Sequence, residues 1–142
     1  MSDFKKLKVW RKSHALALNV HRVATRIRGR DQIALRSQML RAAMSVPANI
    51  VEGTGKGSAA EFCRYLSIAV GSTSELEYHL MVGRDLRVLS NTDFDSLHGE
   101  AVEIRRMLCG LISKVKSPTS RPPAQERRRV VNCATGCCAT GN

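Results

Sequence analysis

Four basic residues between positions 8 and 26 could form a surface for phosphate groups. At about 100° per residue along a helix, Lys8 and Arg26 share one direction, and Lys12 and Arg22 lie about 40° to either side. No Asp or Glu occurs between them. Lysine and arginine supply most of the affinity for a nucleic-acid backbone. We interpret this face as a nucleic-acid contact; a solvated helix face and a contact with an acidic partner are the alternatives.

A fifth basic residue, Lys56, stands in the glycine-rich stretch 53–58. A phosphate-binding P-loop requires a glycine five residues before its Gly-Lys pair and a serine or threonine directly after the lysine. Ile50 and Gly57 occupy those two positions. The stretch is therefore predicted to be a turn between helices. Lys56 and the backbone amides at the start of the next helix could still hold an RNA phosphate.

A second set of polar residues recurs at spacings of three and four, which places its members on one face of a helix. The set comprises Arg41, Ser45, Asn49 and Glu52, with Glu75 on a later segment. Pro47 lies inside the set, and a proline crowds the carbonyl four residues earlier and leaves it without its amide donor. We predict an ion pair between Arg41 and Glu75, and a hydrogen bond from Asn49 to that freed carbonyl. This pattern indicates a structural polar network; a functional cleft is the alternative.

Patterns typical of catalysis or of metal binding do not occur in the sequence. A di-iron bundle needs paired Glu-x-x-His motifs, and Asp95-x-x-His98 is a single imperfect relative. His14 and His21 are seven residues apart, roughly 10 Å along a helix, too far to share one metal ion. No cysteine has a histidine partner that the sequence can supply. The sequence therefore predicts no metal, no cofactor and no enzymatic activity.

Four segments with apolar residues at helical spacing must position these groups. They span residues about 7–27, 33–52, 59–89 and 93–115. Gly53 is predicted to stop the second segment, and Ser58-x-x-Glu61 opens the third as a capping box. Short connections make neighbouring helices antiparallel. The predicted fold class is all-α, an antiparallel up-down four-helix bundle over residues 1–116.

The helical pattern stops at Ser117. Three prolines follow, then a run of three arginines at 127–129 and three cysteines, at 133, 137 and 138. This small, polar and basic composition cannot bury a core. We predict that residues 117–142 form a disordered basic tail. The whole chain has five cysteines, and an odd number in a cytosolic chain argues against a disulfide framework.

The net charge of +11 is unevenly distributed. Residues 1–58 contain 12 Lys/Arg and 3 Asp/Glu, residues 59–116 contain 7 and 8, and residues 117–142 contain 4 and 1. Such asymmetry indicates a polyanionic partner, with nucleic acid favoured over an anionic membrane. No apolar run approaches the ~20 residues of a membrane span, and no secretory signal follows Met1. A cytoplasmic protein is expected.

Three motifs identify a family resemblance. They are Phe4-x-x-Leu7-x-x-Trp10, Gln38-x-x-Arg41-Ala42-x-x-Ser45-Val46-Pro47-x-Asn49-Ile50-x-Glu52-Gly53, and Gly71-Ser72-x-x-Glu75-Leu76. Over about residues 4–115, the chain resembles the small bacterial four-helix-bundle proteins encoded in intervening sequences of 23S rRNA genes. It departs from them in its tail and at Val51, where alanine is commoner.

The resemblance implies a four-helix bundle that assembles into a homopentamer, with no established enzymatic activity. It also implies kinship with accessory proteins of diversity-generating retroelements, which bind a reverse transcriptase and nucleic acid. Together with the charge, this predicts a self-assembling, non-enzymatic protein that binds nucleic acid through its first helix, with RNA preferred because of the family's genomic setting. The alternative is a protein–protein adaptor, such as an accessory subunit that docks a reverse transcriptase.

Overall fold

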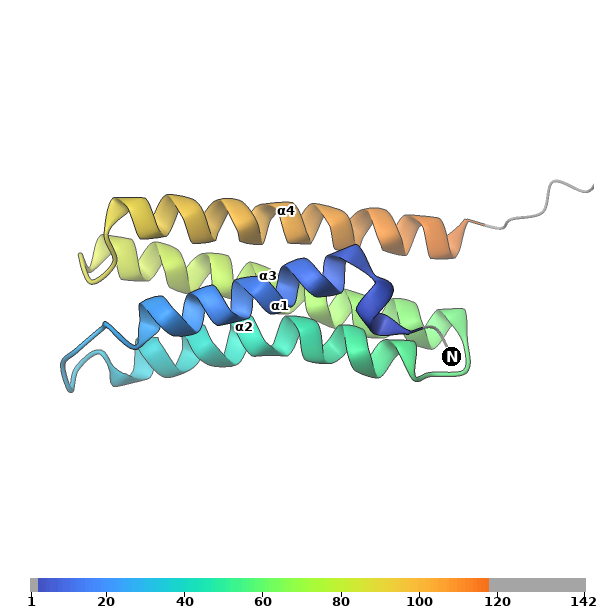
Figure 1. The fold of residues 1–142 in the computed structure, drawn as a ribbon, viewed down its shortest axis with the longest axis horizontal. Helices are drawn as coiled ribbons and strands as arrows, with labels where there is room; N and C mark the ends of the chain where they lie inside the picture. Colours follow the sequence, from blue (N-terminus) through green and yellow to red (C-terminus); the bar gives the residue numbers. More distant parts are fainter. Residues whose placement is uncertain (1–2, 118–142) are drawn as a thin grey trace, which may run out of the picture.

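Four α-helices follow a short 3-10 turn in the computed structural model, which describes residues 3–117 (Figure 1). The turn is η1 (Phe4–Lys6), and the helices are α1 (Lys8–Ala24), α2 (Ile33–Thr54), α3 (Ala59–Asp85) and α4 (Asn91–Lys116). Each of α1 and α3 packs against α2 and α4, so α1 and α3 occupy opposite corners. The predicted all-α four-helix bundle is confirmed. All but the first residue of the predicted tail, 117–142, lie outside the described residues.

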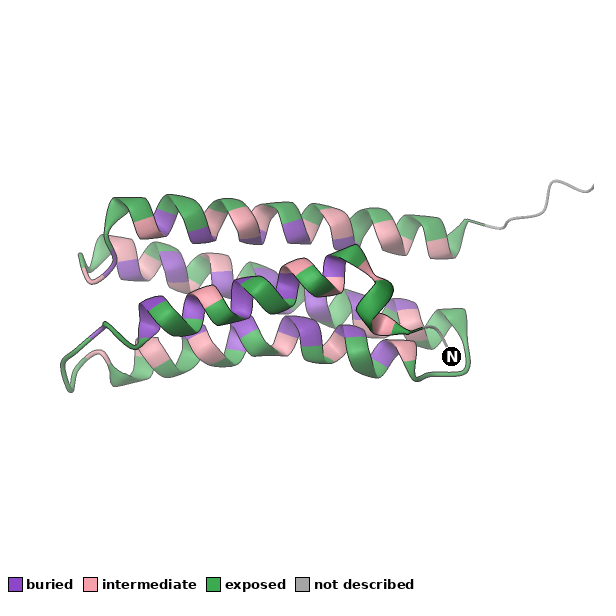
Figure 2. Ribbon diagram, in the orientation of Figure 1, coloured by how far each residue is buried: buried purple, intermediate pink, exposed green. Residues whose placement is uncertain are grey.

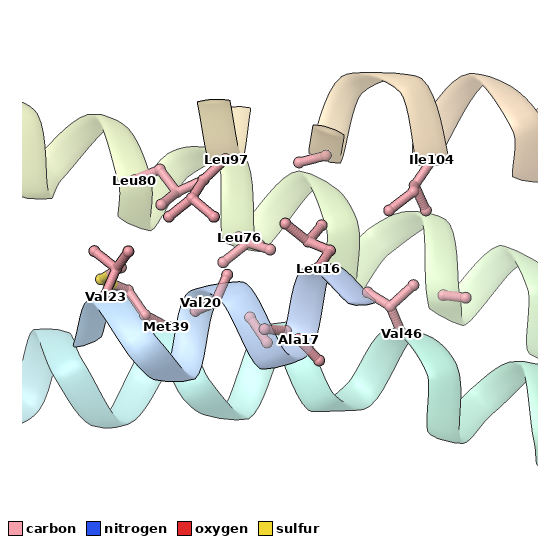
Figure 3. Close-up of a cluster of buried hydrophobic side chains, with 14 of the residues drawn as sticks. Leu16, Ala17, Val20, Val23, Met39, Val46, Leu76, Leu80, Leu97 and Ile104 are labelled. Carbon is pink, nitrogen blue, oxygen red and sulfur yellow. The ribbon is translucent and has the colours of Figure 1, made fainter. Parts of the chain in front are cut away.

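Buried residues recur along each helix with exposed residues between them, as Figure 2 shows. This arrangement follows from apolar residues at spacings of three and four. The core cluster is centred on fully buried aliphatic residues from all four helices (Figure 3). They include Leu16, Val20, Met39, Val46, Leu76, Leu80 and Ile104. No helix within residues 3–117 is long and apolar enough to cross a membrane.

Serine side chains cap the N-termini of α3 and α4. Ser58 accepts a hydrogen bond from the amide of Glu61 at 3.2 Å, which confirms the predicted start of α3. Ser90 accepts from the amide of Asp93 at 3.0 Å and donates to its carboxylate at 2.9 Å. Such caps satisfy amide groups that the first turn of a helix leaves without partners.

The predicted end of the third helix at Leu89 is wrong, because α3 ends at Asp85. Arg87 has a φ of 58°, a left-handed conformation that reverses the chain. The amides of Val88 and Leu89 then both donate to the carbonyl of Gly83, at 3.0 and 3.1 Å. Leu89 lies beyond this turn but is buried. The apolar pattern of the sequence therefore extended to Leu89, past the end of the helix.

Gly53 is not the stop of the second helix. It lies inside α2, which runs on to Thr54, and it is buried. A Cβ at Gly53 would lie 2.9 Å from Cβ of Tyr65 and 3.0 Å from Cδ2 of Phe62. The glycine therefore allows α2 and α3 to approach closely. The helix also passes through Pro47 without a break.

Candidate nucleic-acid interface

Two of the four predicted phosphate-binding cations lie beside α4: Lys12 on α1, and Arg26 two residues beyond the end of α1. The ammonium of Lys12 lies 2.6 Å from a carboxylate oxygen of Glu103, and the guanidinium of Arg26 lies 3.9 Å from Asp93. Arg26 is nevertheless exposed, whereas Lys12 is half-buried. The opposing acids come from α4, and a projection of α1 alone does not include them.

Lys12 holds the pKa of Glu103 below its ordinary value, first through their hydrogen bond and then through charge attraction, to which Lys8 adds. Because the folded-state pKa is lowered, the pair stabilises the fold above the ordinary titration range of glutamate. That contribution is lost as acid protonates Glu103. We expect Lys12→Gln to raise the pKa of Glu103 toward the ordinary value of a glutamate, measured by an NMR pH titration of its side chain. An unchanged pKa would show that the ion pair does not form in solution.

The other two predicted cations on α1, Lys8 and Arg22, are exposed. Arg22 donates a hydrogen bond to the side-chain oxygen of Asn19 at 3.0 Å. The amide nitrogen of Asn19 in turn lies 3.3 Å from both carboxylate oxygens of Glu100. Arg22 therefore reaches α4 only through a neutral amide, and its charge is not neutralised by direct contact.

Three further exposed cations were missed by the sequence interpretation: Lys5, Lys6 and Arg11. Arg11 lies within about 20° of Arg22 around the helix axis, so the helical spacing contained this signal. The two lysines stand in η1, outside α1. We call the set the outer basic face. It comprises Lys5, Lys6, Lys8, Arg11 and Arg22. Within residues 3–117, none of the five forms an ion pair.

The side chain of Lys56 already contacts a carboxylate and an aromatic ring. Its ammonium lies 3.4 Å from Glu52 and 5.1 Å from the ring centre of Tyr65. The hydrogen bond to Glu52 raises the pKa of Lys56, and the tyrosine hydroxyl donates to the same carboxylate at 3.1 Å. A cavity of about 480 Å³ lies beside this turn, lined also by Leu7 and Phe62. Lys56 is thus less available to a phosphate than predicted.

The predicted polar set lies along the contact between α2 and α3. Arg41 forms the predicted ion pair with Glu75, and His79 lies 3.5 Å from the same carboxylate. The hydroxyls of Ser45 and Ser72 are 2.9 Å apart. These contacts join the two helices, as expected of a structural network.

The predicted role of Asn49 is wrong in its detail. Its amide donates to the carbonyl of Ser45 at 2.8 Å and to the Ser45 hydroxyl at 3.0 Å. The carbonyl that Pro47 leaves without its usual donor is that of Ala43, four residues earlier. Asn49 therefore fixes the Ser45 side chain in the network instead of compensating for the proline.

A groove of about 410 Å³ runs between α1 and α2. We call it the α1–α2 groove. It is lined by Trp10, His14, Ala17, Leu18 and His21 from α1, and by Met44, Pro47, Ala48 and Val51 from α2. Leu18 is 55% exposed and Met44 is 51% exposed. The sequence analysis did not identify this groove, because it treated each helix separately.

Metal-ligating side chains do not gather in the described chain. Across residues 3–117, no group of three or more His, Cys, Asp or Glu residues is placed to hold a metal ion. Cys63 is buried and Cys109 is exposed, and both are free thiols. The cysteines of the predicted tail lie outside the described residues.

Comparisons with known proteins match the chain to a family model and to solved structures. The family model described as "23S rRNA-intervening sequence protein" matches residues 5–110. A crystal structure of a protein of unknown function from the S23 ribosomal protein family of Bacteroides thetaiotaomicron VPI-5482 is 26% identical. That alignment covers 73% of this chain and 97% of the other, with a TM-score of 0.69. No curated protein matches the chain.

Proposed function

The chain belongs to the 23S rRNA-intervening sequence protein family, and on that basis we propose that it is a cytoplasmic, non-enzymatic, self-associating protein that binds RNA. The outer basic face supplies the contacts. The family name ties these proteins to ribosomal RNA genes, which favours RNA over DNA as the ligand. Lys12, Arg26 and Lys56 contribute less than the sequence alone predicts, because each lies beside a carboxylate.

One observation carries this proposal: the five cations of the outer basic face are all exposed and form no ion pair within residues 3–117. A cation already paired with a carboxylate must give up that partner to bind a phosphate, whereas an unpaired one gives up only water and counterions. Neutralising phosphates releases the counterions condensed on the nucleic acid, which drives binding. The unpaired cations should therefore contribute more to phosphate binding than the cations that are paired with carboxylates.

Recognition is expected to depend on the backbone and not on the bases. Proteins that bind single strands tightly add stacking aromatic rings to their basic grooves. Near the outer basic face, Trp10 is half-buried, but other rings already pack against it. The ring centre of His14 lies 5.2 Å away in a stacked arrangement, and that of Phe4 lies 4.9 Å away, edge-on. Tyr78 is 61% exposed but lies on α3, at the opposite corner of the bundle. We therefore expect little sequence preference.

The salt dependence of RNA binding tests the proposal. For single strands, the slope of log K against log salt is about −0.7 for each phosphate neutralised. Replacing Lys8, Arg11 and Arg22 by glutamine should therefore make the slope shallower by about 2. The measurement is fluorescence anisotropy with a labelled single-stranded RNA over a series of salt concentrations, with helicity checked by circular dichroism.

A matched control removes the same charge from paired positions. The triple variant Lys12→Gln, Arg26→Gln, Lys56→Gln should change the slope by less than half as much. An equal change in both variants would show that net charge governs binding, and no interface would then be assigned to the outer basic face. Failure of the unaltered protein to bind RNA would reject the proposed function.

An adaptor function is the second candidate, and the lack of exposed aromatic rings on the outer basic face favours it. A set of unpaired cations without stacking groups suits an acidic protein surface as well as a phosphate backbone. In that case the partner would be an enzyme such as a reverse transcriptase. Co-purification of a neighbouring reverse transcriptase, abolished by the Lys8, Arg11 and Arg22 variant, would support the adaptor function. Failure to co-purify would count against it.

A further inference from the structure

Two adjoining cavities lie at the end of the bundle where the junction of η1 and α1, the α2–α3 turn and the end of α4 come together (Figure 1). One is the cavity beside Lys56, and the other lies between the start of α3 and the end of α4. Ala59 and Val115 line both. We call the two cavities together the end groove. Each has a volume of about 480 Å³, within the range of about 300–1,000 Å³ that is typical of small-molecule sites.

The lining of the end groove is positively charged and contains no carboxylate. Lys56, Arg64 and Lys116 line it, and no Asp or Glu does. Lys56 is paired with Glu52 and Arg64 with Glu61, but neither glutamate lines the groove. Lys116 forms no ion pair within residues 3–117, so it is the cation most free to reach a ligand. An anion in the end groove would meet no opposing charge from the lining.

Part of the end groove is apolar. Leu7, Phe62 and Val115 line it, and all three are half-buried. Across residues 3–117, no other aromatic ring packs against Phe62. A nucleic-acid base of any sequence can stack on an aromatic ring that lines a basic groove. The lining therefore suits a ligand that combines an anionic group with a flat apolar ring.

The end groove adjoins the outer basic face. Leu7, which lines the groove, stands between Lys6 and Lys8 of that face in the chain. A nucleic-acid strand whose phosphates contact these lysines can therefore reach the groove without leaving the protein. On the other side of the groove, α4 ends at Lys116. The sequence then continues into residues 117–142, which contain 4 Lys/Arg and 1 Asp/Glu.

We propose that the end groove binds a nucleotide that carries a terminal phosphate, with the phosphate beside the cations and the base against Phe62. A terminal phosphate has a charge of about −1.5 to −2 at pH 7, more than a phosphodiester within a strand, so it gains more from the cations of the lining. The hydroxyl of Ser58 accepts the amide of Glu61 and keeps its hydrogen for a phosphate oxygen. The favoured source is the end of an RNA strand on the outer basic face, and in that form the inference rests on the proposed function. A free mononucleotide is the other source.

Two variants test the end groove without touching the core. Gly57→Glu places a carboxylate in it, and a Cβ at Gly57 would meet nothing within 4 Å. Its matched control is Gly99→Glu, which adds the same charge at an exposed and equally open position on α4 outside the groove. Lys116→Gln removes a cation from the groove. Its control is Lys114→Gln, at an exposed lysine that does not line the groove.

Two probes distinguish the sources of the nucleotide. A short single-stranded RNA with a 5′-phosphate should bind the full chain about tenfold more tightly than the same RNA with a 5′-hydroxyl, the gain expected of one charge-assisted hydrogen bond. Fluorescence anisotropy measures both affinities. Free AMP should shift the NMR amide signals of Gly55, Gly57 and Ser58, and adenosine should not. Gly57→Glu and Lys116→Gln should each abolish both responses, and the two control variants should keep them.

The outcomes separate this proposal from the proposed function. A response to AMP alone would assign the end groove to free nucleotides, and a preference for phosphorylated RNA alone would assign it to RNA ends. The absence of both responses would overturn the proposal, and so would an equal loss in Gly57→Glu and Gly99→Glu. Failure to bind either RNA would reject the proposed function, and the AMP titration would then decide whether the end groove binds nucleotides.

Discussion

Leu76→Ala is expected to destabilise the fold by about 2–5 kcal/mol, the range for truncating a fully buried leucine. Leu76 lies on α3 in the middle of the core, near Leu16 and Val20 (Figure 3), and is fully buried. The surrounding helices are held by their own contacts and can close the resulting cavity only in part. Urea unfolding followed by circular dichroism at a fixed chain concentration would measure the change. A loss of this size is a large fraction of the about 5–15 kcal/mol that stabilises a typical domain.

Leu86→Ala is the matched control for this prediction. Leu86 follows α3 directly and is 55% exposed, so its truncation leaves no cavity. Surface substitutions of this kind usually change stability by less than about 0.5 kcal/mol. If the two variants lost the same stability, the core would not be centred on Leu76, and the bundle would have to be packed differently.

The sequence predicted the helices well, because a bundle core imposes its period locally on every element. In α4, Leu97, Ala101, Ile104 and Leu108 follow one another at the helical spacings of four and three, and all four are buried. The end of α3 could not be predicted in the same way. Leu89 continues the apolar period, but it reaches the core after a turn at Arg87. Apolar spacing is the same whether the helix continues to Leu89 or a turn brings Leu89 back to the core.

The ion pairs of α1 were missed because they depend on which helix lies next to it. Lys12 lies on α1 and Arg26 lies just beyond its end. The sequence of this segment does not indicate which helix packs beside them. The signal was present in α4, where Asp93, Glu100 and Glu103 recur at spacings of seven and three. Only the packing of α1 against α4 brings this acidic face beside the cations.

The network between α2 and α3 was easier to predict in outline than in detail. A short connection makes these helices antiparallel neighbours, so the spacing of Arg41 and Glu75 was enough to suggest their ion pair, which the structure contains. The partner of Asn49 depends on its side-chain rotamer. From one helical position, a short amide can reach several carbonyls of the preceding turn, and the sequence does not select among them.

Gly53→Ala is expected to destabilise the fold by about 1–3 kcal/mol, the usual result of forcing an extra methyl group into a packed contact. The new Cβ would lie 2.9 Å from Cβ of Tyr65. That atom is attached directly to the α3 backbone, so it cannot move aside unless the helix moves. Gly53 is the last residue but one of α2, and so alanine's better helix propensity offsets little of this cost. Urea unfolding would again measure the change.

Gly99→Ala separates this steric effect from the general effect of removing a glycine. Gly99 lies inside α4 and is exposed, and a Cβ there would meet nothing within 4 Å. Alanine at such a position should stabilise the helix by up to about 1 kcal/mol. The same substitution therefore has opposite signs at the two sites. If Gly53→Ala also stabilised the protein, α2 and α3 would not approach each other closely at this point.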